Sequence, residues 1–180
     1  MKLKNIIYED FVNYKKTSMF ILTTACSFKC EKEANCIGMC QNSDLVKSKT
    51  IEIDNKILID RYLNNGITEA VVIGGLEPLD TFEDTLQFIK DFREKSNDDI
   101  VIYTGFNEDE IEDKIVILQK FKNIIVKFGR YRPNFQKHFD KVLGVELASP
   151  NQYAKKISWG GGCINDYCME RFGYKFTKYY

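Results

Sequence analysis

The chain has 180 residues, with 26 Lys and Arg, 26 Asp and Glu, and a formal net charge of zero. This length suits one compact domain, and the balanced charge argues against a dedicated nucleic-acid or membrane-surface binder, which would carry a basic excess. Hydrophobic residues make up 44% of the chain, which excludes a disordered protein, and no apolar run approaches the roughly 18 residues of a spanning helix. The first residues lack the features of a signal peptide, so we expect a cytoplasmic protein.

Apolar, β-branched runs alternate with amphipathic segments along the chain. In chain order we predict a strand at 18–24, a loop at 25–50, a helix at 54–65, a strand at 68–73, a helix at 81–95, a strand at 99–103, a helix at 107–121, a strand at 123–128 and short edge strands at 142–147 and 155–158. Asp54 is the predicted N-cap of the first helix, and capping boxes of Thr81 with Asp84 and Asn107 with Glu110 are predicted to open the other two. This alternation indicates an α/β fold with a mostly parallel sheet.

Unusual segments follow each of the four main predicted strands. The first is the loop at 25–50, and the others are Gly-Gly-Leu-Glu-Pro-Leu at 74–79, Tyr-Thr-Gly at 103–105 and Lys-Phe-Gly-Arg-Tyr at 127–131. The carboxyl ends of parallel strands meet at one edge of a sheet, and ligands bind there. We therefore predict a ligand site at this edge.

Cysteines dominate the first of these segments. Cys26, Cys30, Cys36 and Cys40 lie within fifteen residues, in a chain for which we expect a reducing compartment. Clustered thiols in such a compartment indicate a metal site or thiol chemistry rather than structural disulfides. The single histidine, His138, argues against Ser-His-Asp or Cys-His hydrolysis and against multi-histidine metal sites.

The spacing Cys-x3-Cys-x5-Cys-x3-Cys differs from a zinc finger, whose ligands form two close pairs separated by a longer gap. Four thiolates would close a structural Zn or Fe–S site, whereas three would hold an Fe–S cubane with one iron open to an outside ligand. The glycines at the neighbouring strand ends favour the open cluster, because backbone without side chains suits a small-molecule cosubstrate. The loop alone leaves both alternatives open.

Two parts of this loop, Thr-Ala-Cys-Ser-Phe-Lys-Cys at 24–30 and Cys-Gln-Asn-Ser-Asp at 40–44, resemble the cluster loop of radical S-adenosylmethionine (SAM) enzymes. Within that superfamily the chain is most similar to the activating proteins of anaerobic (class III) ribonucleotide reductases. The segment at 10–13 resembles the one before their loop, and 74–79 resembles the Gly-Gly-Glu-Pro-Leu segment that holds the SAM amino group. Further segments follow in the family's order at 103–106, 125–131 and 149–152.

This resemblance implies a partial (β/α) barrel with a [4Fe–4S] cluster and S-adenosylmethionine at the C-terminal ends of the strands. The metal ligands that it implies are Cys26, Cys30 and Cys40. Glu77, with the backbone of Gly74 and Gly75, would receive the SAM ammonium. Further candidates for SAM or backbone contacts are Asn42, Tyr103, Thr104 and Asn151. Reductive cleavage of SAM would give a 5′-deoxyadenosyl radical, which in these activating proteins abstracts a hydrogen atom from a glycine of the reductase.

The chain departs from the family pattern in three places. An insertion breaks the usual Cys-x3-Cys-x2-Cys, so the third ligand is Cys36 or Cys40, and we favour Cys40 because the residues after it match the family's continuation. Leu76 stands where the family has a glycine, and the glycine-rich run before the first strand is replaced at 13–16.

The resemblance further implies a glycyl radical enzyme as protein substrate and a reductant such as flavodoxin or ferredoxin, with no nucleic acid and no membrane. The alternatives are a non-catalytic four-Cys Zn or Fe–S interaction module and a radical SAM maturase of another protein or peptide. We divide the chain into a domain at 1–158 and a Gly/Cys/aromatic tail at 159–180. Cys163 and Cys168 are either ordinary thiols or, with Cys36, ligands of a second metal. Arg130 and Arg132 are expected in a solvated loop.

Overall fold

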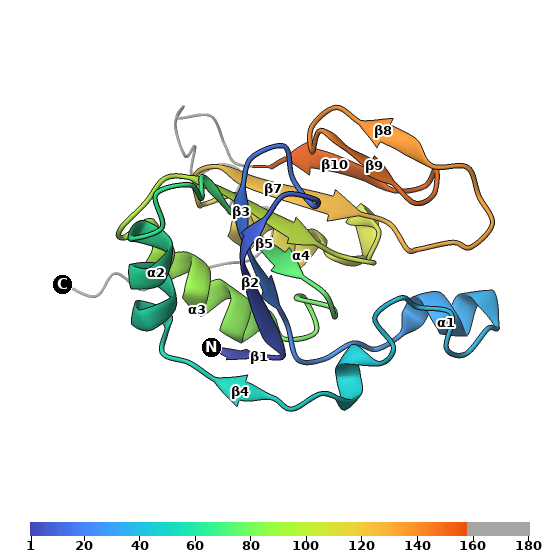
Figure 1. The fold of residues 1–180 in the computed structure, drawn as a ribbon. Helices are drawn as coiled ribbons and strands as arrows, with labels where there is room; N and C mark the ends of the chain where they lie inside the picture. Colours follow the sequence, from blue (N-terminus) through green and yellow to red (C-terminus); the bar gives the residue numbers. More distant parts are fainter. Residues whose placement is uncertain (158–180) are drawn as a thin grey trace.

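A six-stranded sheet forms the centre of the computed structural model, which describes residues 1–157 (Figure 1). Its strands, in spatial order, are β10 (Tyr153–Lys156), β7 (Ile124–Phe128), β6 (Asp99–Tyr103), β5 (Ala70–Gly74), β3 (Ser18–Leu22) and β2 (Asn5–Asp10). The four inner strands are parallel, and β2 and β10 pair with them antiparallel at the two edges. The predicted tail at 159–180, with Cys163 and Cys168, lies outside the described residues.

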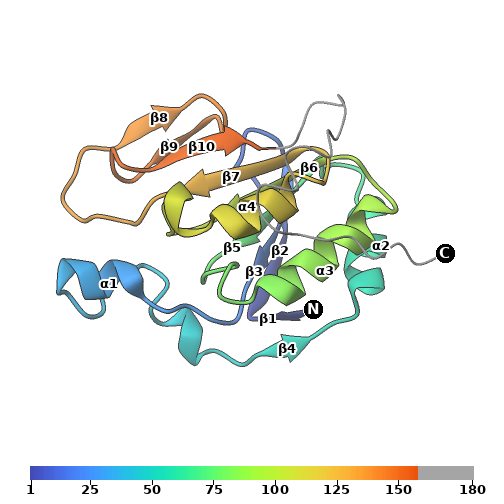
Figure 2. The same ribbon diagram turned by 180° about the vertical axis from the view of Figure 1, so that it is seen from behind.

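Helices cover one face of the sheet (Figure 2). They are α2 (Asn55–Leu63), α3 (Phe82–Arg93) and α4 (Glu112–Leu118). Their apolar sides pack on alternate strand residues such as Val71 and Ile73, and this contact is the larger hydrophobic core. Within residues 1–157, no helix is long and apolar enough to cross a membrane.

A second, smaller layer packs on the other face of the sheet. A two-stranded sheet of β8 (His138–Asp140) and β9 (Val145–Leu147) packs there through Leu143 and Leu147 against Val72 and Val101, forming a smaller core. The short strands β1 (Lys2–Leu3) and β4 (Ile51–Glu52) pair with each other. Helix α1 (Lys29–Ala34) and a 3-10 turn, η1 (Leu45–Lys47), lie in the cysteine loop, beyond the carboxyl ends of the parallel strands (Figure 1).

The α/β class and the mostly parallel sheet are confirmed, while the closure of this sheet into a partial barrel stays a prediction. The Asp54 cap is also confirmed, because its carboxylate accepts a hydrogen bond from the Lys56 amide at 2.8 Å. The predicted capping box at Thr81 is wrong: Thr81 makes no side-chain cap, and the Asp84 carboxylate accepts from the Lys2 amide at 3.1 Å.

Three other differences concern element boundaries. The predicted helix at 107–121 is divided into a 3-10 turn, η2 (Glu108–Glu110), and α4. The segment at 142–147 contributes β9 to the separate small sheet instead of an edge strand to the main one. Strands β1, β2, β4 and β8 had no counterpart in the prediction; β2, the longest of them, has no strict alternation of buried and exposed residues.

Candidate functional site

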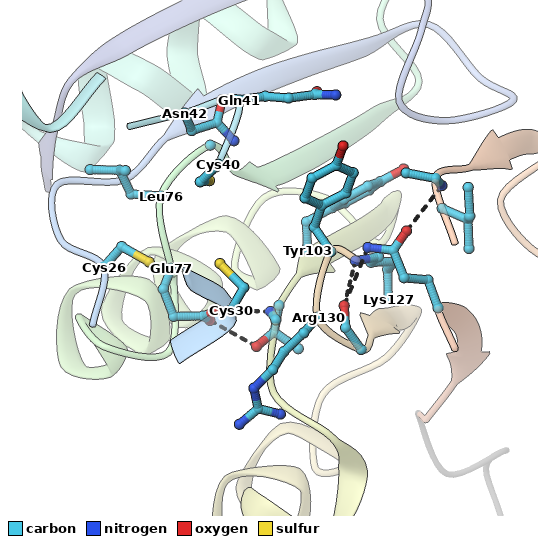
Figure 3. A pocket seen from close by; sticks show the side chains of 18 of the residues that line it. Cys26, Cys30, Cys40, Gln41, Asn42, Leu76, Glu77, Tyr103, Lys127 and Arg130 are labelled. Carbon is cyan, nitrogen blue, oxygen red and sulfur yellow. Dashed lines mark hydrogen bonds between the residues drawn. The ribbon is translucent and has the colours of Figure 1, made fainter. Parts of the chain in front are cut away.

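A cavity of about 390 Å³ lies where the carboxyl ends of β3, β5, β6 and β7 meet. Its volume falls in the range of roughly 300–1,000 Å³ that is usual for small-molecule sites. The predicted residues that line it are Cys26, Cys30, Cys40, Asn42, Gly75, Glu77, Tyr103 and Thr104 (Figure 3). The convergence that the strand order predicted therefore exists, and all four strand-end segments contribute to it.

Two residues of the predicted site, Gly74 and Asn151, do not line the cavity but contact residues that do. Gly74 ends β5, and a side chain there would meet Cβ of Tyr103 at 3.0 Å and the Phe20 ring at 3.2 Å. The side-chain amide of Asn151 donates a hydrogen bond to the Arg130 carbonyl at 2.8 Å. Both residues therefore shape neighbours that line the cavity.

Three of the four clustered thiols line this cavity. Interaction between the Cys30 and Cys40 thiols raises the pKa of Cys30 and lowers that of Cys40. Burial raises the pKa of Cys26 to about 11. Cys36 is exposed and does not line the cavity. The thiols of Cys26, Cys30 and Cys40 are thus close enough to influence one another's ionisation, and Cys36 stands apart.

This thiol set fits an iron–sulfur cluster. Among residues 1–157, no three His, Cys, Asp or Glu side chains form a group that could hold a metal ion as they stand. The thiolates of a cubane bind separate iron atoms, so they need not meet at one point, and soft sulfur ligands suit such clusters. Three thiols around one cavity are a donor set of this kind.

Glu77 places a buried carboxylate beside the thiols. The left-handed Gly75, with φ of +81°, turns the chain after β5, and the Glu77 amide donates to the Ala25 carbonyl at 2.8 Å. Burial raises the pKa of this carboxyl to about 7. Its Oε1 accepts from the Thr104 hydroxyl at 2.8 Å and its Oε2 from the Gly105 amide at 2.8 Å, so the carboxylate is held in one orientation.

Lys127 brings a buried ammonium to the same cavity, and no role was predicted for it from the sequence. It lies on β7 in register with Tyr103 of β6 and is only 6% exposed. Its Nζ donates to the Gly129 carbonyl at 2.9 Å, and no ion pair of Lys127 occurs within the described residues. Burial lowers its pKa to about 8, although the negative charge of Glu77 opposes this shift. The sequence feature that could have indicated a role for Lys127 is its place inside the otherwise apolar run 124–128.

Arg130 is buried, so the expectation of a solvated loop is wrong for it, whereas Arg132 is exposed as expected. The two terminal nitrogens of Arg130 each lie 2.6 Å from a carboxylate oxygen of Glu110, and the Arg130 Nε lies 2.9 Å from Glu33 Oε2. Because Glu33 belongs to α1, these ion pairs connect the cysteine loop to the far side of the cavity. The pKa of Glu110 falls to about 2, chiefly through its hydrogen bonds with Arg130.

The structure thus defines an α/β protein with a mostly parallel sheet and a thiol-lined cavity at the carboxyl ends of its parallel strands. A family model described as a 4Fe-4S single cluster domain matches residues 15–147. The chain belongs to this family, and a [4Fe–4S] cluster-binding domain is indicated. No curated protein and no solved structure matches the chain.

Proposed function

We propose that the protein is a radical SAM enzyme whose cluster is held by Cys26, Cys30 and Cys40. One observation carries the proposal: these thiols share a cavity with a buried carboxylate, Glu77, and a buried ammonium, Lys127. We further propose that the open sheet is the partial barrel of that superfamily, because its parallel strands end at this cavity.

The charges of the cavity match the amino-acid part of SAM, which carries an ammonium and a carboxylate. Glu77 would receive the ammonium and Lys127 the carboxylate. Burying an ion is costly unless a counter-ion accompanies it. A zwitterionic ligand would therefore pair with the Glu77 carboxylate and the Lys127 ammonium at once. Thr104 and the Gly105 amide already orient the Glu77 carboxylate, which reduces the ordering cost of binding.

With the cluster bound and reduced, the chemistry supplied would be one-electron cleavage of SAM to methionine and a 5′-deoxyadenosyl radical. The residues of the chain bind, orient and exclude water. Leu76 and Phe106 line the cavity and keep its wall apolar. Cys36 is exposed, which favours three thiolate ligands and an open iron over a closed four-Cys Zn or Fe–S module.

The resemblance of the cysteine loop to that of the activating proteins supports a protein as the substrate. We propose a glycyl radical enzyme such as an anaerobic ribonucleotide reductase as that substrate, and flavodoxin or ferredoxin as the reductant in the cytoplasm. Maturation of another protein or a peptide is the alternative, and capture of the partner under anaerobic conditions would distinguish them.

The test is reductive SAM cleavage. The protein is reconstituted anaerobically with iron and sulfide, mixed with dithionite and SAM, and assayed for 5′-deoxyadenosine. We expect product from the wild type and from Cys36→Ser, and none from the matched variant Cys40→Ser. A wild-type protein that carries a complete cluster but forms no 5′-deoxyadenosine would contradict the proposal and favour the binding module.

A further inference from the structure

Glu31 lies directly after Cys30 in α1, and its side chain turns back onto the returning part of the cysteine loop. Its Oε1 accepts a hydrogen bond from the Cys40 amide at 3.0 Å and lies 2.7 Å from the Ser43 hydroxyl. The residue is only 7% exposed. A carboxylate is therefore held inside the loop that carries the cluster thiols.

The backbone between these thiols makes a wide excursion. Helix α1 ends at Ala34, its C-cap Asn35 is left-handed, and the Cys36 amide donates to the Glu31 carbonyl at 3.0 Å. The chain then exposes Ile37 almost completely, at 97%, before it returns to Cys40. Nine residues separate Cys30 from Cys40. The return point needs a fixed contact if both sulfur atoms are to face one cavity.

Glu31 and Ser43 together hold Cys40 by both of its backbone polar groups. The Cys40 amide donates to Glu31, and the Cys40 carbonyl accepts from the Ser43 amide at 3.0 Å and lies 2.8 Å from the Ser43 hydroxyl. The same hydroxyl contacts Glu31, which closes the set. Donors of the chain thus occupy the Glu31 oxygen that contacts Cys40 and Ser43. This oxygen positions the backbone of the loop and does not act as a metal ligand.

We propose that Glu31 is a positioning residue that fixes Cys40 beside Cys30 across the long insertion and so sets the geometry of the third thiolate. The proposal rests on Cys40 as a cluster ligand, the assignment made above. The Glu31 carboxylate adds negative charge beside the cluster thiolates, which is unfavourable. Its hydrogen bonds with Cys40 and Ser43 offset this cost and hold Cys40 in place.

The test compares Glu31→Ala and Glu31→Gln with the matched control Asp44→Asn in the full-length protein. The control removes the same charge from the same loop at an exposed residue that pairs with Lys47, and it leaves the contacts of Cys40 intact. Iron and sulfide per chain and the electron paramagnetic resonance spectrum of the reduced cluster are measured without SAM. We expect Glu31→Ala to lose at least half of the iron or to show an altered spectrum. Glu31→Gln keeps an acceptor oxygen and should rescue the wild-type spectrum, which the control also shows.

A wild-type iron content and spectrum in Glu31→Ala would overturn the proposal, as would an equal loss in the control. Ser43→Ala provides a second variant that leaves α1 unchanged, and we expect an intermediate effect on the spectrum. If Glu31→Ala fails to fold, by circular dichroism, a wild-type spectrum in Ser43→Ala overturns the proposal and a shifted one supports it. Because none of these measurements involves SAM, a failure of the radical SAM proposal would leave their outcome unchanged.

Discussion

Replacing Lys127 by Met should stabilise the iron-free protein at neutral pH. Burial lowers the pKa of Lys127 from 10.5 to about 8. At about 1.4 kcal/mol per pKa unit, keeping this ammonium charged at pH 7 costs about 3 kcal/mol of folding free energy. Loss of the hydrogen bond to the Gly129 carbonyl offsets about 1 kcal/mol of that gain. We therefore expect the free energy of unfolding to rise by about 2 kcal/mol.

The stability gain of Lys127→Met depends on pH through the Lys127 proton. Between pH 8 and 10.5 the unfolded chain holds the Lys127 proton and the folded protein has released it, so wild-type stability rises with pH in this window. The advantage of Lys127→Met should fall by about 2 kcal/mol between pH 7 and pH 9.5. Urea denaturation of both proteins at the two pH values measures it. A variant less stable than the wild type at pH 7, or an advantage independent of pH, would refute the reasoning.

Three further predictions concern the surroundings of the cavity and the core. Gly129→Ala should cost about 3 kcal/mol of unfolding free energy in denaturant titration, because φ is +94° and the new Cβ would lie 2.4 Å from the Asn151 carbonyl oxygen. Arg130→Gln should raise the pKa of Glu110 from about 2 toward its ordinary 4.5 in an NMR titration. The wild type would then lose more stability than the variant as the pH falls from 4.5 to 2, and equal losses would contradict this. Phe88→Ala, in the centre of α3, should lower the unfolding free energy by about 3–5 kcal/mol, and a loss below 1 kcal/mol would contradict the packing.

The fold was predictable where the pattern was local. The run at 99–103 became β6 with the predicted bounds, and the four parallel strands follow one another in the sheet as they do in the chain. The predicted helix at 107–121 was wrong because the Asn107–Glu110 capping box opens a 3-10 turn, and α4 begins only at Glu112. Pairing of β1 with β4 joins residues some fifty positions apart, which no short window of sequence can indicate.

The site was predictable to the extent that strand order decides it. Glu77 and three thiols reached one cavity because their segments follow parallel strands. Lys127 and Arg130 were missed or misjudged because their meaning depends on burial and on partners from other elements. The Glu33 contact of Arg130 is an example, since it crosses from α1 to the end of β7.

The order in which the cavity wall is assembled has a consequence for how the protein matures. The thiols lie in the first connection of the parallel sheet, while Lys127 comes from β7, about a hundred residues later. During synthesis the thiols leave the ribosome before β5, β6 and β7 emerge from it, so a metal bound then would meet an incomplete wall. Parallel pairings are non-local and form slowly. We therefore expect cluster delivery after the sheet has formed to yield correctly loaded protein, and early delivery to favour misligated chains.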